Sequence, residues 1–333
     1  MSDHRTESRS GVEHASGAAG WLAFARRRRS LAALDSQRRG VQLAPEAAEG
    51  CERWDMVEHG TVGLVGLGEI GLPMASRLVQ AGWRVVGYDV QGKALEQAVA
   101  AGVQRAGSPA EVVRAVDRTI VSVVRTLPQT EAVLFGADGL VSANRPTLDV
   151  AVMSTLNPAA MAKLAERAAG HGLTLVDAPV SGGRAGAEAG TLAIMLAGEP
   201  PALERMRPVL ELLGTNRFVL GERAGMDQAA KLANQVMLTA ALLGVAEGLT
   251  LARSFGLDAG TVLPIIGVSV GNSWAAQNWT TARRWWETYQ PGTTLDILVK
   301  DLRSVQSCAA DAGLSLPVAA CVLEQILGAW PPK

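Results

Sequence analysis

A strand, a glycine-rich turn, a helix and a second strand follow one another within residues 61–92, and this unit constrains the fold more than any other segment. The apolar run Val62–Leu67 predicts a buried strand, and apolar residues at helical spacing predict a helix that stops at Gly82. A second apolar run, Arg84–Tyr88, ends on Asp89. The segment is typical of the first βαβ unit of a parallel sheet.

The turn carries glycines with three separate roles. Gly66 allows the tight turn, Gly68 lets a pyrophosphate approach the backbone, and Gly71 lets the helix pack closely on the strand. The amino end of the helix then offers free N–H groups and partial positive charge to phosphates. The residues predicted to bind a cofactor here are Gly66, Leu67, Gly68, Glu69, Ile70 and Gly71. A βαβ turn that binds no ligand is the alternative.

Asp89 is placed to select between two cofactors. A carboxylate at the end of the second strand would bond a ribose 2′-hydroxyl and repel a 2′-phosphate. The predicted cofactor is therefore NAD rather than NADP. Lys93, four residues further on, is the side chain that could reverse this preference.

Length and composition limit the remaining possibilities. A chain of 333 residues exceeds one average domain, so two domains are expected. With 48% hydrophobic residues and a net charge of −1, it can bury a sizeable core and favours neither nucleic acid nor a membrane surface. The three cysteines form no paired motif and the four histidines show no zinc spacing, so we expect no metal and a cytoplasmic location.

Residues 1–55 differ from the rest of the chain. They are rich in Ala, Gly, Ser and Arg without sustained periodicity, so we expect them to be mostly disordered. A twin-arginine signal is disfavoured because charged residues interrupt any apolar stretch after Arg26–Arg29, and a transit peptide because the segment carries several acids. A start codon assigned too early is the favoured interpretation, since Met56 lies just before the first strand.

Strands and helices alternate after Asp89 as far as Leu220, which predicts a Rossmann-type α/β fold with a doubly wound, mostly parallel sheet. From Gly225 onward the strands stop. Met226–Phe255 predicts one long helix that is apolar nearly all round and so needs burial on several sides. Further helices are expected at 259–267, 273–286, 295–311 and 317–329. We therefore expect an NAD-binding Rossmann domain over 56–222 and an all-helical substrate and oligomerisation domain over 223–330.

Three loops are predicted at the carboxyl ends of the strands, where open α/β sheets bind their ligands. They are Thr126–Pro128, Ser154–Thr155 and Ser181–Gly183. In the third, one hydroxyl and consecutive N–H groups could hold a carboxylate. A simple glycine-rich turn explains that loop equally well.

Lys231 is the candidate for acid–base chemistry. It lies early in the long helix within an apolar stretch, where partial burial would lower its pKa and let it exchange protons. Asn234 and Gln235 share its helical face and could orient it. Lys300 is ambiguous, because an ordinary helical ion pair with Asp296 explains it about as well.

Three segments carry a family resemblance: GLGEIGLPMASRL (66–78), DAPVSGG (177–183) and GMDQAAKLANQ (225–235). They resemble the signatures of the β-hydroxyacid dehydrogenase family, which includes 3-hydroxyisobutyrate, L-threonate and 6-phosphogluconate dehydrogenases and tartronate semialdehyde reductase. The resemblance extends over roughly residues 60–330, in family order and spacing.

The resemblance implies roles for individual residues. Lys231 would be the general acid/base, and Ser181, Gly182 and Gly183 would hold the substrate carboxylate. Leu127, Pro128 and Thr155 would lie near the nicotinamide, with Lys300 projecting into the cleft. Many members carry Asn four residues after the lysine where this chain has Gln235, so it is open whether Asn234 or Gln235 touches the substrate.

The resemblance also suggests a substrate. Segments 271–274 and 295–301 are similar to the L-threonate dehydrogenase branch, and the amides of Asn234 and Gln235 could bind additional hydroxyl groups. We therefore predict a three- or four-carbon sugar acid such as threonate or glycerate. Trp274, Trp279, Trp285 and Trp286 are candidates for the wall of the substrate pocket, although packing in the core or a subunit interface explains them equally.

Several alternatives remain open. A 3-hydroxyisobutyrate dehydrogenase and an imine-reductase-like enzyme share the expected architecture, although imine reductases usually replace the lysine. A 6-phosphogluconate dehydrogenase is disfavoured because segment 223–330 is too short. A cofactor-binding regulatory module without catalysis is disfavoured by Lys231. We expect a homodimer or homotetramer that binds neither nucleic acid nor membranes.

Overall fold

The structure is a computed structural model that describes residues 60–328. These residues all belong to one compact unit. The predictions of disorder and of a mis-assigned start concern residues 1–55, which lie outside the described range.

A nine-stranded sheet forms the first part of the described chain. Its strands are β1 (Thr61–Val65), β2 (Arg84–Tyr88), β3 (Gln104–Arg105), β4 (Thr119–Ser122), β5 (Leu148–Val152), β6 (Leu173–Asp177), β7 (Val180–Ser181), β8 (Ala193–Ala197) and β9 (Asn216–Gly221). Their order is β3-β2-β1-β4-β5-β6-β8-β7, with β9 beside β8. Strands β1 to β6 are parallel, whereas β8 is antiparallel to β6 and β7. The predicted Rossmann-type sheet is confirmed, and the order reverses between β1 and β4.

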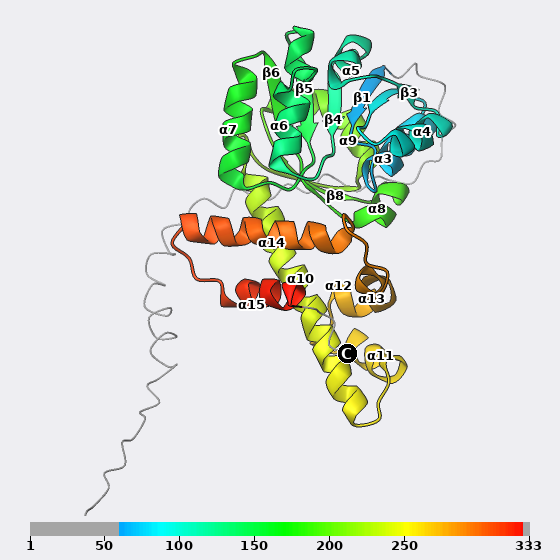
Figure 1. The fold of residues 1–333 in the computed structure, drawn as a ribbon, viewed down its shortest axis with the longest axis vertical. Helices are drawn as coiled ribbons and strands as arrows, with labels where there is room; N and C mark the ends of the chain where they lie inside the picture. The colour runs from blue at the N-terminus through cyan, green and yellow to red at the C-terminus, as the bar shows by residue number, and fades with distance from the viewer. Residues whose placement is uncertain (1–59, 329–333) are drawn as a thin grey trace, which may run out of the picture. The chain divides into compact units, whose positions relative to one another are not determined.

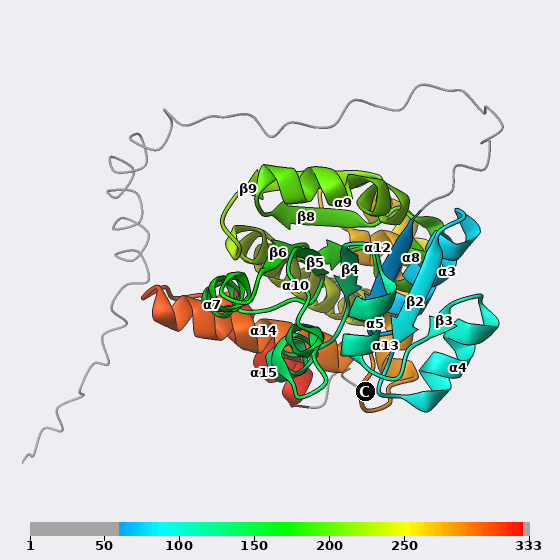
Figure 2. The same ribbon diagram turned by 90° about the horizontal axis from the view of Figure 1, so that it is seen from above.

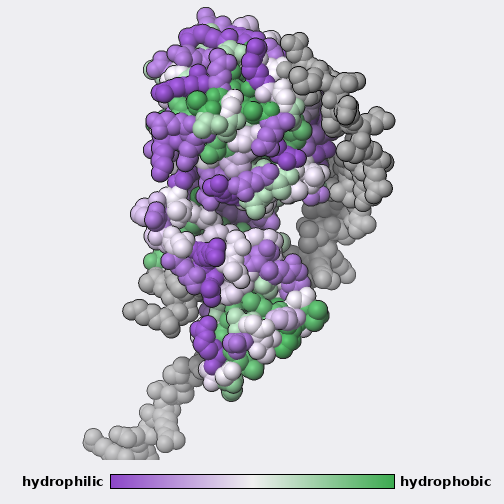
Figure 3. All heavy atoms as spheres, turned by 90° about the vertical axis from the view of Figure 1, so that its right-hand side faces the viewer, coloured by the Kyte–Doolittle hydropathy of each residue, from purple (hydrophilic) through white to green (hydrophobic). Residues whose placement is uncertain are grey.

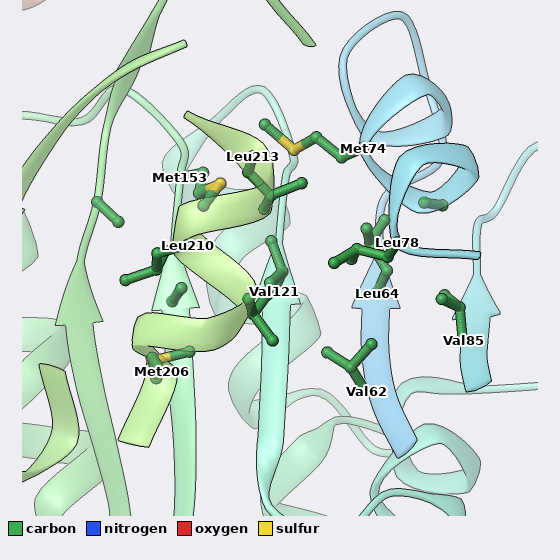
Figure 4. Packing of buried hydrophobic residues seen from close by; sticks show 14 of the residues in the cluster. Val62, Leu64, Met74, Leu78, Val85, Val121, Met153, Met206, Leu210 and Leu213 are labelled. Atoms are coloured by element: carbon green, nitrogen blue, oxygen red, sulfur yellow. The ribbon is translucent and has the colours of Figure 1, made fainter. Parts of the chain in front are cut away.

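Helices cover both faces of this sheet (Figure 2). They are α3 (Gly71–Gln80), α4 (Gly92–Ala100), α5 (Pro109–Ala115), α6 (Leu127–Phe135), α7 (Pro158–Ala169), α8 (Gly183–Ala189), α9 (Pro200–Leu213) and the 3₁₀-helix η2 (Leu140–Ala143). Side chains of α3, α4, α8 and α9 form one hydrophobic core with the strands, and those of α5, α6 and α7 form the other. Figure 4 shows Met206, Leu210 and Leu213 of α9 packed towards Val121 of β4.

Some elements differ from the predictions. The sequence pattern missed β3 and β7, because two-residue strands are too short to show a period of two, and it missed α8, whose small residues form no apolar stripe. Thr126–Pro128, predicted as a loop, instead opens α6: Thr126 caps the helix and Leu127 and Pro128 are its first residues. The Thr126 and Gln129 side chains form a reciprocal capping box, which is a readable sequence signal.

Six helices make up the described chain after residue 225. They are α10 (Met226–Ser254), α11 (Ala259–Gly267), α12 (Trp274–Gln277), α13 (Trp279–Glu287), α14 (Thr294–Asp311) and α15 (Pro317–Leu327). The change from strands to helices falls where the sequence predicts it, between Gly221 and Met226. The single helix predicted over 273–286 is two helices, because the backbone leaves helical geometry at Asn278. The division into two domains at about residue 222 stays a prediction.

Helix α10 is the centre of the helical part, and Figure 1 shows it passing beside α14 and α15 and ending at α11. Its first turns pack on β8 and α7. In its second half, Leu243 packs against α14 and α15, and Leu242, Ala246 and Leu249 pack on another side, whereas Leu251 is exposed. The predicted burial on several sides therefore holds for part of this half, whereas the apolar residues near the end of the helix stay exposed. By length and composition α10 could also cross a membrane, and 33% of its most apolar window is buried.

Candidate active site

The glycine-rich turn between β1 and α3 has the geometry that a bound pyrophosphate requires. Gly66 has a φ of +95°, and a Cβ there would lie 2.1 Å from the carbonyl oxygen of Val123. A Cβ on Gly71 would lie 1.9 Å from the carbonyl oxygen of Gly66, whereas one on Gly68 would meet nothing within 4 Å. No side chain caps the first turn of α3. Gly66 and Gly71 thus serve the close packing of the turn, and Gly68 leaves open space for a ligand.

Asp89 is fixed beside this turn by two main-chain donors. Its Oδ2 accepts a hydrogen bond from the Leu67 N–H at 2.6 Å, and its Oδ1 accepts one from the Gln91 N–H at 2.7 Å. Each carboxylate oxygen has a second lone pair, which leaves it able to accept a bond from a ribose hydroxyl. The described residues therefore fit an adenosine ribose at this position.

Lys231 is buried on α10, with only 6% of its surface exposed. Burial lowers the pKa of its ammonium group to about 8; the carboxylate of Asp301 opposes this effect, and the positive charge of Lys300 adds to it. Its Nζ donates a hydrogen bond to Gln235 Oε1 at 2.9 Å. Lys231 can therefore hold or release a proton close to neutral pH.

A chain of polar contacts leads from Lys231 to the sheet. Gln235 Nε2 donates to Asp301 Oδ2 at 2.7 Å, and Asp301 is 1% exposed. The other oxygen of Asp301 forms an ion pair with Lys300 Nζ at 2.7 Å. Lys300 Nζ also donates to the carbonyl oxygen of Thr155, in the loop after β5, at 2.5 Å. Lys300, Asp301, Gln235 and Lys231 thus form one connected network.

These contacts bear on two questions that the sequence leaves open. Asp296, the alternative partner for Lys300, instead accepts hydrogen bonds from Tyr289 and from the main chain of Gly292. Both ends of the Gln235 amide are occupied, by Lys231 and Asp301. Asn234 donates its Nδ2 to Gln235 at 3.2 Å, while its carbonyl oxygen has no partner in the described chain. Asn234 therefore has the free acceptor.

The Ser181–Gly183 loop lies at the end of the short strand β7, which pairs with β8. Gly182 and Gly183 have φ values of +131° and +61°, a region that favours glycine. A Cβ on Gly183 would meet nothing within 4 Å, and within residues 60–328 the Ser181 hydroxyl has no hydrogen-bond partner. The loop can therefore offer a hydroxyl and main-chain N–H groups to a ligand.

A cavity of about 920 Å³ lies between the sheet and α14. Three of the predicted residues, Leu127, Thr155 and Lys300, line it, and so do Trp286 and Tyr289. The other predicted site residues lie outside its lining: the glycine turn with Asp89 and Pro128, the Ser181 loop, and Lys231 with its two amides. The Asp301–Lys300 pair connects Lys231 to the cavity.

Two further points concern Trp274 and metal binding. Trp274, predicted to contact substrate, is 47% exposed and stacks on Trp285 with ring centroids 5.7 Å apart, so its role stays a prediction. Among residues 60–328, no group of three or more His, Cys, Asp or Glu side chains could hold a metal ion.

Sequence reasoning missed three buried polar residues next to the site: Asp227, Gln228 and Asp301. Each stands at a position where helical spacing calls for an apolar residue. Asp301 lies on the buried face of α14 between Leu298 and Val305, and Gln228 lies one turn before Leu232 on α10. A polar residue on an otherwise apolar helical face is the signal that could have found them.

Comparisons with known proteins agree with this geometry. Residues 61–221 match the family described as the NAD binding domain of 6-phosphogluconate dehydrogenase. Residues 218–329 match the family described as NAD-binding of NADP-dependent 3-hydroxyisobutyrate dehydrogenase. The two matches together span almost all described residues.

Individual relatives are similar over most of their length. The NAD-dependent L-serine dehydrogenase of Pseudomonas aeruginosa is 33% identical over 79% of this chain and 89% of its own. The L-threonate dehydrogenase of Cupriavidus necator is 32% identical over 80% and 89%. A solved structure of the Mycobacterium tuberculosis 3-hydroxyisobutyrate dehydrogenase with L-serine superposes with a TM-score of 0.71 at 30% identity, covering 81% of this chain and 93% of that one.

The different surroundings of Gly68 and Gly71 predict different effects of the same substitution. Gly71→Ala forces a methyl group against the Gly66 carbonyl, so its melting temperature should fall, with overpacking typically costing about 1–3 kcal/mol. Gly68→Ala has room and should melt like the wild type, but its methyl group occupies the pyrophosphate position. Its Kd for NADH, from fluorescence titration, should rise at least about tenfold. Unchanged NADH binding by Gly68→Ala would place the cofactor elsewhere.

Proposed function

The chain belongs to the β-hydroxyacid dehydrogenase family, and we propose that it oxidises a small polar hydroxy acid, such as threonate or glycerate, with Lys231 as the general acid/base. As a member of that family it is an NAD(P)-dependent oxidoreductase acting on a CH–OH group. The observation that carries the proposal is the buried Lys231, whose pKa of about 8 suits proton transfer at physiological pH.

The proposed mechanism uses the chain's own residues for binding and proton transfer. The loop Ser181–Gly183 holds the substrate carboxylate through its hydroxyl and N–H groups. Neutral Lys231 accepts the proton of the substrate hydroxyl at Nζ, and in the reverse direction the ammonium form returns it. The bound nicotinamide supplies the hydride acceptor or donor. Leu127, Thr155 and Lys300 border the cavity proposed for that ring.

The two amides next to Lys231 have different proposed tasks. Gln235 fixes the lysine through its carbonyl oxygen, because its NH₂ group is committed to Asp301. Asn234 keeps a free carbonyl oxygen that can accept a bond from a further substrate hydroxyl. This arrangement favours substrates with more than one hydroxyl group.

We propose NAD as the preferred cofactor because the carboxylate of Asp89 is held at the end of β2 next to the turn. A 2′-phosphate there would face a like charge, which disfavours binding. The expected kcat/KM is at least about tenfold higher with NAD than with NADP, and Asp89→Ser should reduce that ratio. Glu96→Gln, which removes an exposed charge from α4, the helix after β2, serves as the control. A wild-type kcat/KM with NADP equal to or above that with NAD would contradict the role of Asp89.

We also propose that the protein is a cytoplasmic homodimer or homotetramer associated through the far end of α10 and α11. Exposed apolar side chains gather there, as the lower part of Figure 3 shows: Leu251, Phe255, Leu257, Ile265, Val268 and Val270. An apolar patch of this kind marks an interaction surface. Its residues lie away from the glycine turn, so association through it leaves the proposed cofactor site open.

Light scattering after size exclusion tests the oligomer. The wild type should elute with a mass of at least two chains, and Val268→Asp should shift it towards one chain because a charge disrupts an apolar interface. Val90→Asp, at an exposed valine next to Asp89, should leave the mass unchanged. A wild type that is monomeric at micromolar concentration would refute the proposed association.

The substrate class is tested by a panel under one set of conditions. We expect kcat/KM with NAD to be higher for L-threonate or D-glycerate than for 3-hydroxyisobutyrate, which replaces a hydroxyl by a methyl group. A site built for hydroxyls leaves its polar groups unpaired with an apolar analogue, so discrimination can be large. L-Serine belongs in the panel because a relative is named for it. Preference for 3-hydroxyisobutyrate would overturn the sugar-acid assignment and leave the family membership intact.

A further inference from the structure

Gln228 joins three segments of the site although it lies away from the proposed reacting atoms. It is fully buried in the first turn of α10. Its Oε1 accepts from the Leu156 N–H at 2.8 Å, and its Nε2 donates to the Ser154 carbonyl at 3.0 Å and to Asp177 Oδ1 at 2.6 Å. One amide thus ties α10 to the loop after β5 and to the end of β6.

Asp227 is the neighbouring residue and is also fully buried. Within residues 60–328, only the main-chain N–H groups of Asp227 itself and of Gln228 act as donors on its carboxyl group, and they lower its pKa less than burial raises it. Its hydrogen-bond partner is the carboxyl of Asp177, which also accepts from the Gly225 N–H at 2.8 Å. Two carboxyl groups can share a hydrogen bond only when one of them holds a proton, so this pair carries one proton and one negative charge.

The surroundings explain why the proton stays. Burial raises the pKa of Asp227 to about 9, and the hydrogen bond to Asp177 and the charge of that residue act in the same direction. Burial also raises the pKa of Asp177, against the hydrogen bonds that it accepts. An ionised Asp227 would be a buried charge next to a second negative charge, with only the main-chain N–H groups of Asp227 and Gln228 in the described chain to offset it.

Other charged groups around this end of α10 are engaged elsewhere or exposed. Strand β8 carries no ionisable side chain, and on α7 the side chains of Lys163, Glu166 and Arg167 are exposed. On β9, Arg217 pairs with Glu211. From α14, Lys300 and Asp301 pair with each other, and Lys231 lies one turn further along α10. Asp177 is therefore the charged group that acts on Asp227.

We propose that Asp177, Asp227 and Gln228 form a proton-dependent latch that holds the first turn of α10 on the sheet and thereby positions Lys231. Lys231 follows Asp227 by one helical turn, and Ser181 follows Asp177 by four residues, so the latch fixes both relative to the loop that carries Thr155. Its members are positioning residues because they reach the proposed reaction only through these neighbours. The kinetic part of this inference rests on the proposed function; the structural part does not.

Asp227→Asn tests the latch, because an asparagine amide can donate to Asp177 without titrating. The folded chain holds a proton on Asp227 up to about pH 9 and the unfolded chain loses it at about pH 4, so wild-type stability should fall as pH rises between those values. Between pH 6 and 9 the melting temperature of the full-length wild type should fall by at least about 3 °C more than that of Asp227→Asn.

Glu247→Gln is the matched control, since it removes a carboxylate from an exposed position on the same helix. Its melting temperature should follow the wild-type curve. If the melting temperatures of the wild type and Asp227→Asn fall equally between pH 6 and 9, the latch is overturned. If Asp227→Asn does not fold, Asp177→Asn removes the charge and the hydrogen bond that add to the effect of burial, so its melting temperature should fall less between pH 6 and 9 than that of the wild type. An equal fall would overturn the latch.

The kinetic readout separates positioning from a purely structural role. Oxidation by the wild type should rise with pH as Lys231 loses its proton and then fall above about pH 9, when the pair ionises. In Asp227→Asn the oxidation rate should stay constant above about pH 9, because the pair no longer ionises. Its KM for NAD should stay within about twofold of wild type. If the oxidation rate of Asp227→Asn falls above about pH 9 as it does in the wild type, the latch is contradicted. Absence of hydroxy-acid oxidation by the wild type would refute the proposed function, while the melting curves would still decide the latch.

Discussion

The site depends on keeping Lys231 out of water without pairing it directly to a carboxylate. A direct ion pair would hold the pKa of the lysine high, and the lysine could not release its proton at neutral pH. The neutral amide of Gln235 stands between Lys231 and Asp301 and satisfies both. Lys300 offsets the charge of Asp301, so the field that would raise the pKa of Lys231 is reduced. Desolvation then dominates, and the pKa falls to about 8.

The α/β part of the chain supplies the fixed points for this arrangement. The loop after β5 receives Lys300 at Thr155 and Gln228 at Ser154 and Leu156. The end of β6 receives α10 through Asp177. Because both loops leave the carboxyl ends of neighbouring parallel strands, they meet at the edge where this type of sheet binds ligands. The lysine is thus placed by contacts to main-chain groups of the sheet and not by the helical part alone.

The sequence was sufficient for the features that have local signals. The βαβ unit with its glycines, the strand boundaries of β2, and the change to helices after Gly221 all follow from short-range patterns. Lys231 could be singled out because a lysine in an apolar helix is unusual. The Ser181 loop could be singled out by its place after a predicted strand, and its role stays a proposal.

The remaining features depend on contacts between distant parts of the chain. Asp301 is 66 residues from Gln235, and Gln228 is 72 from Leu156, so neither partner is visible in a local pattern. The preference between Asn234 and Gln235 also required the position of Asp301. The exposure of Leu251 and Phe255 at the end of α10 could not be read from its composition, because an apolar residue has the same hydropathy whether or not a neighbour covers it.

The most direct test of the central claim is the pH dependence of hydride transfer in single-turnover experiments, in which NADH formation is followed with saturating hydroxy acid. Between pH 6 and 9 the wild type should show one ionisation near pH 8, with the rate rising as Lys231 becomes neutral. Lys231→Arg should lack this ionisation and be slower by a factor of about 10²–10⁴, because arginine keeps its charge and cannot take up the proton. A wild-type rate that is flat from pH 6 to 9, or a Lys231→Arg variant that reacts at the wild-type rate, would contradict general base catalysis by Lys231.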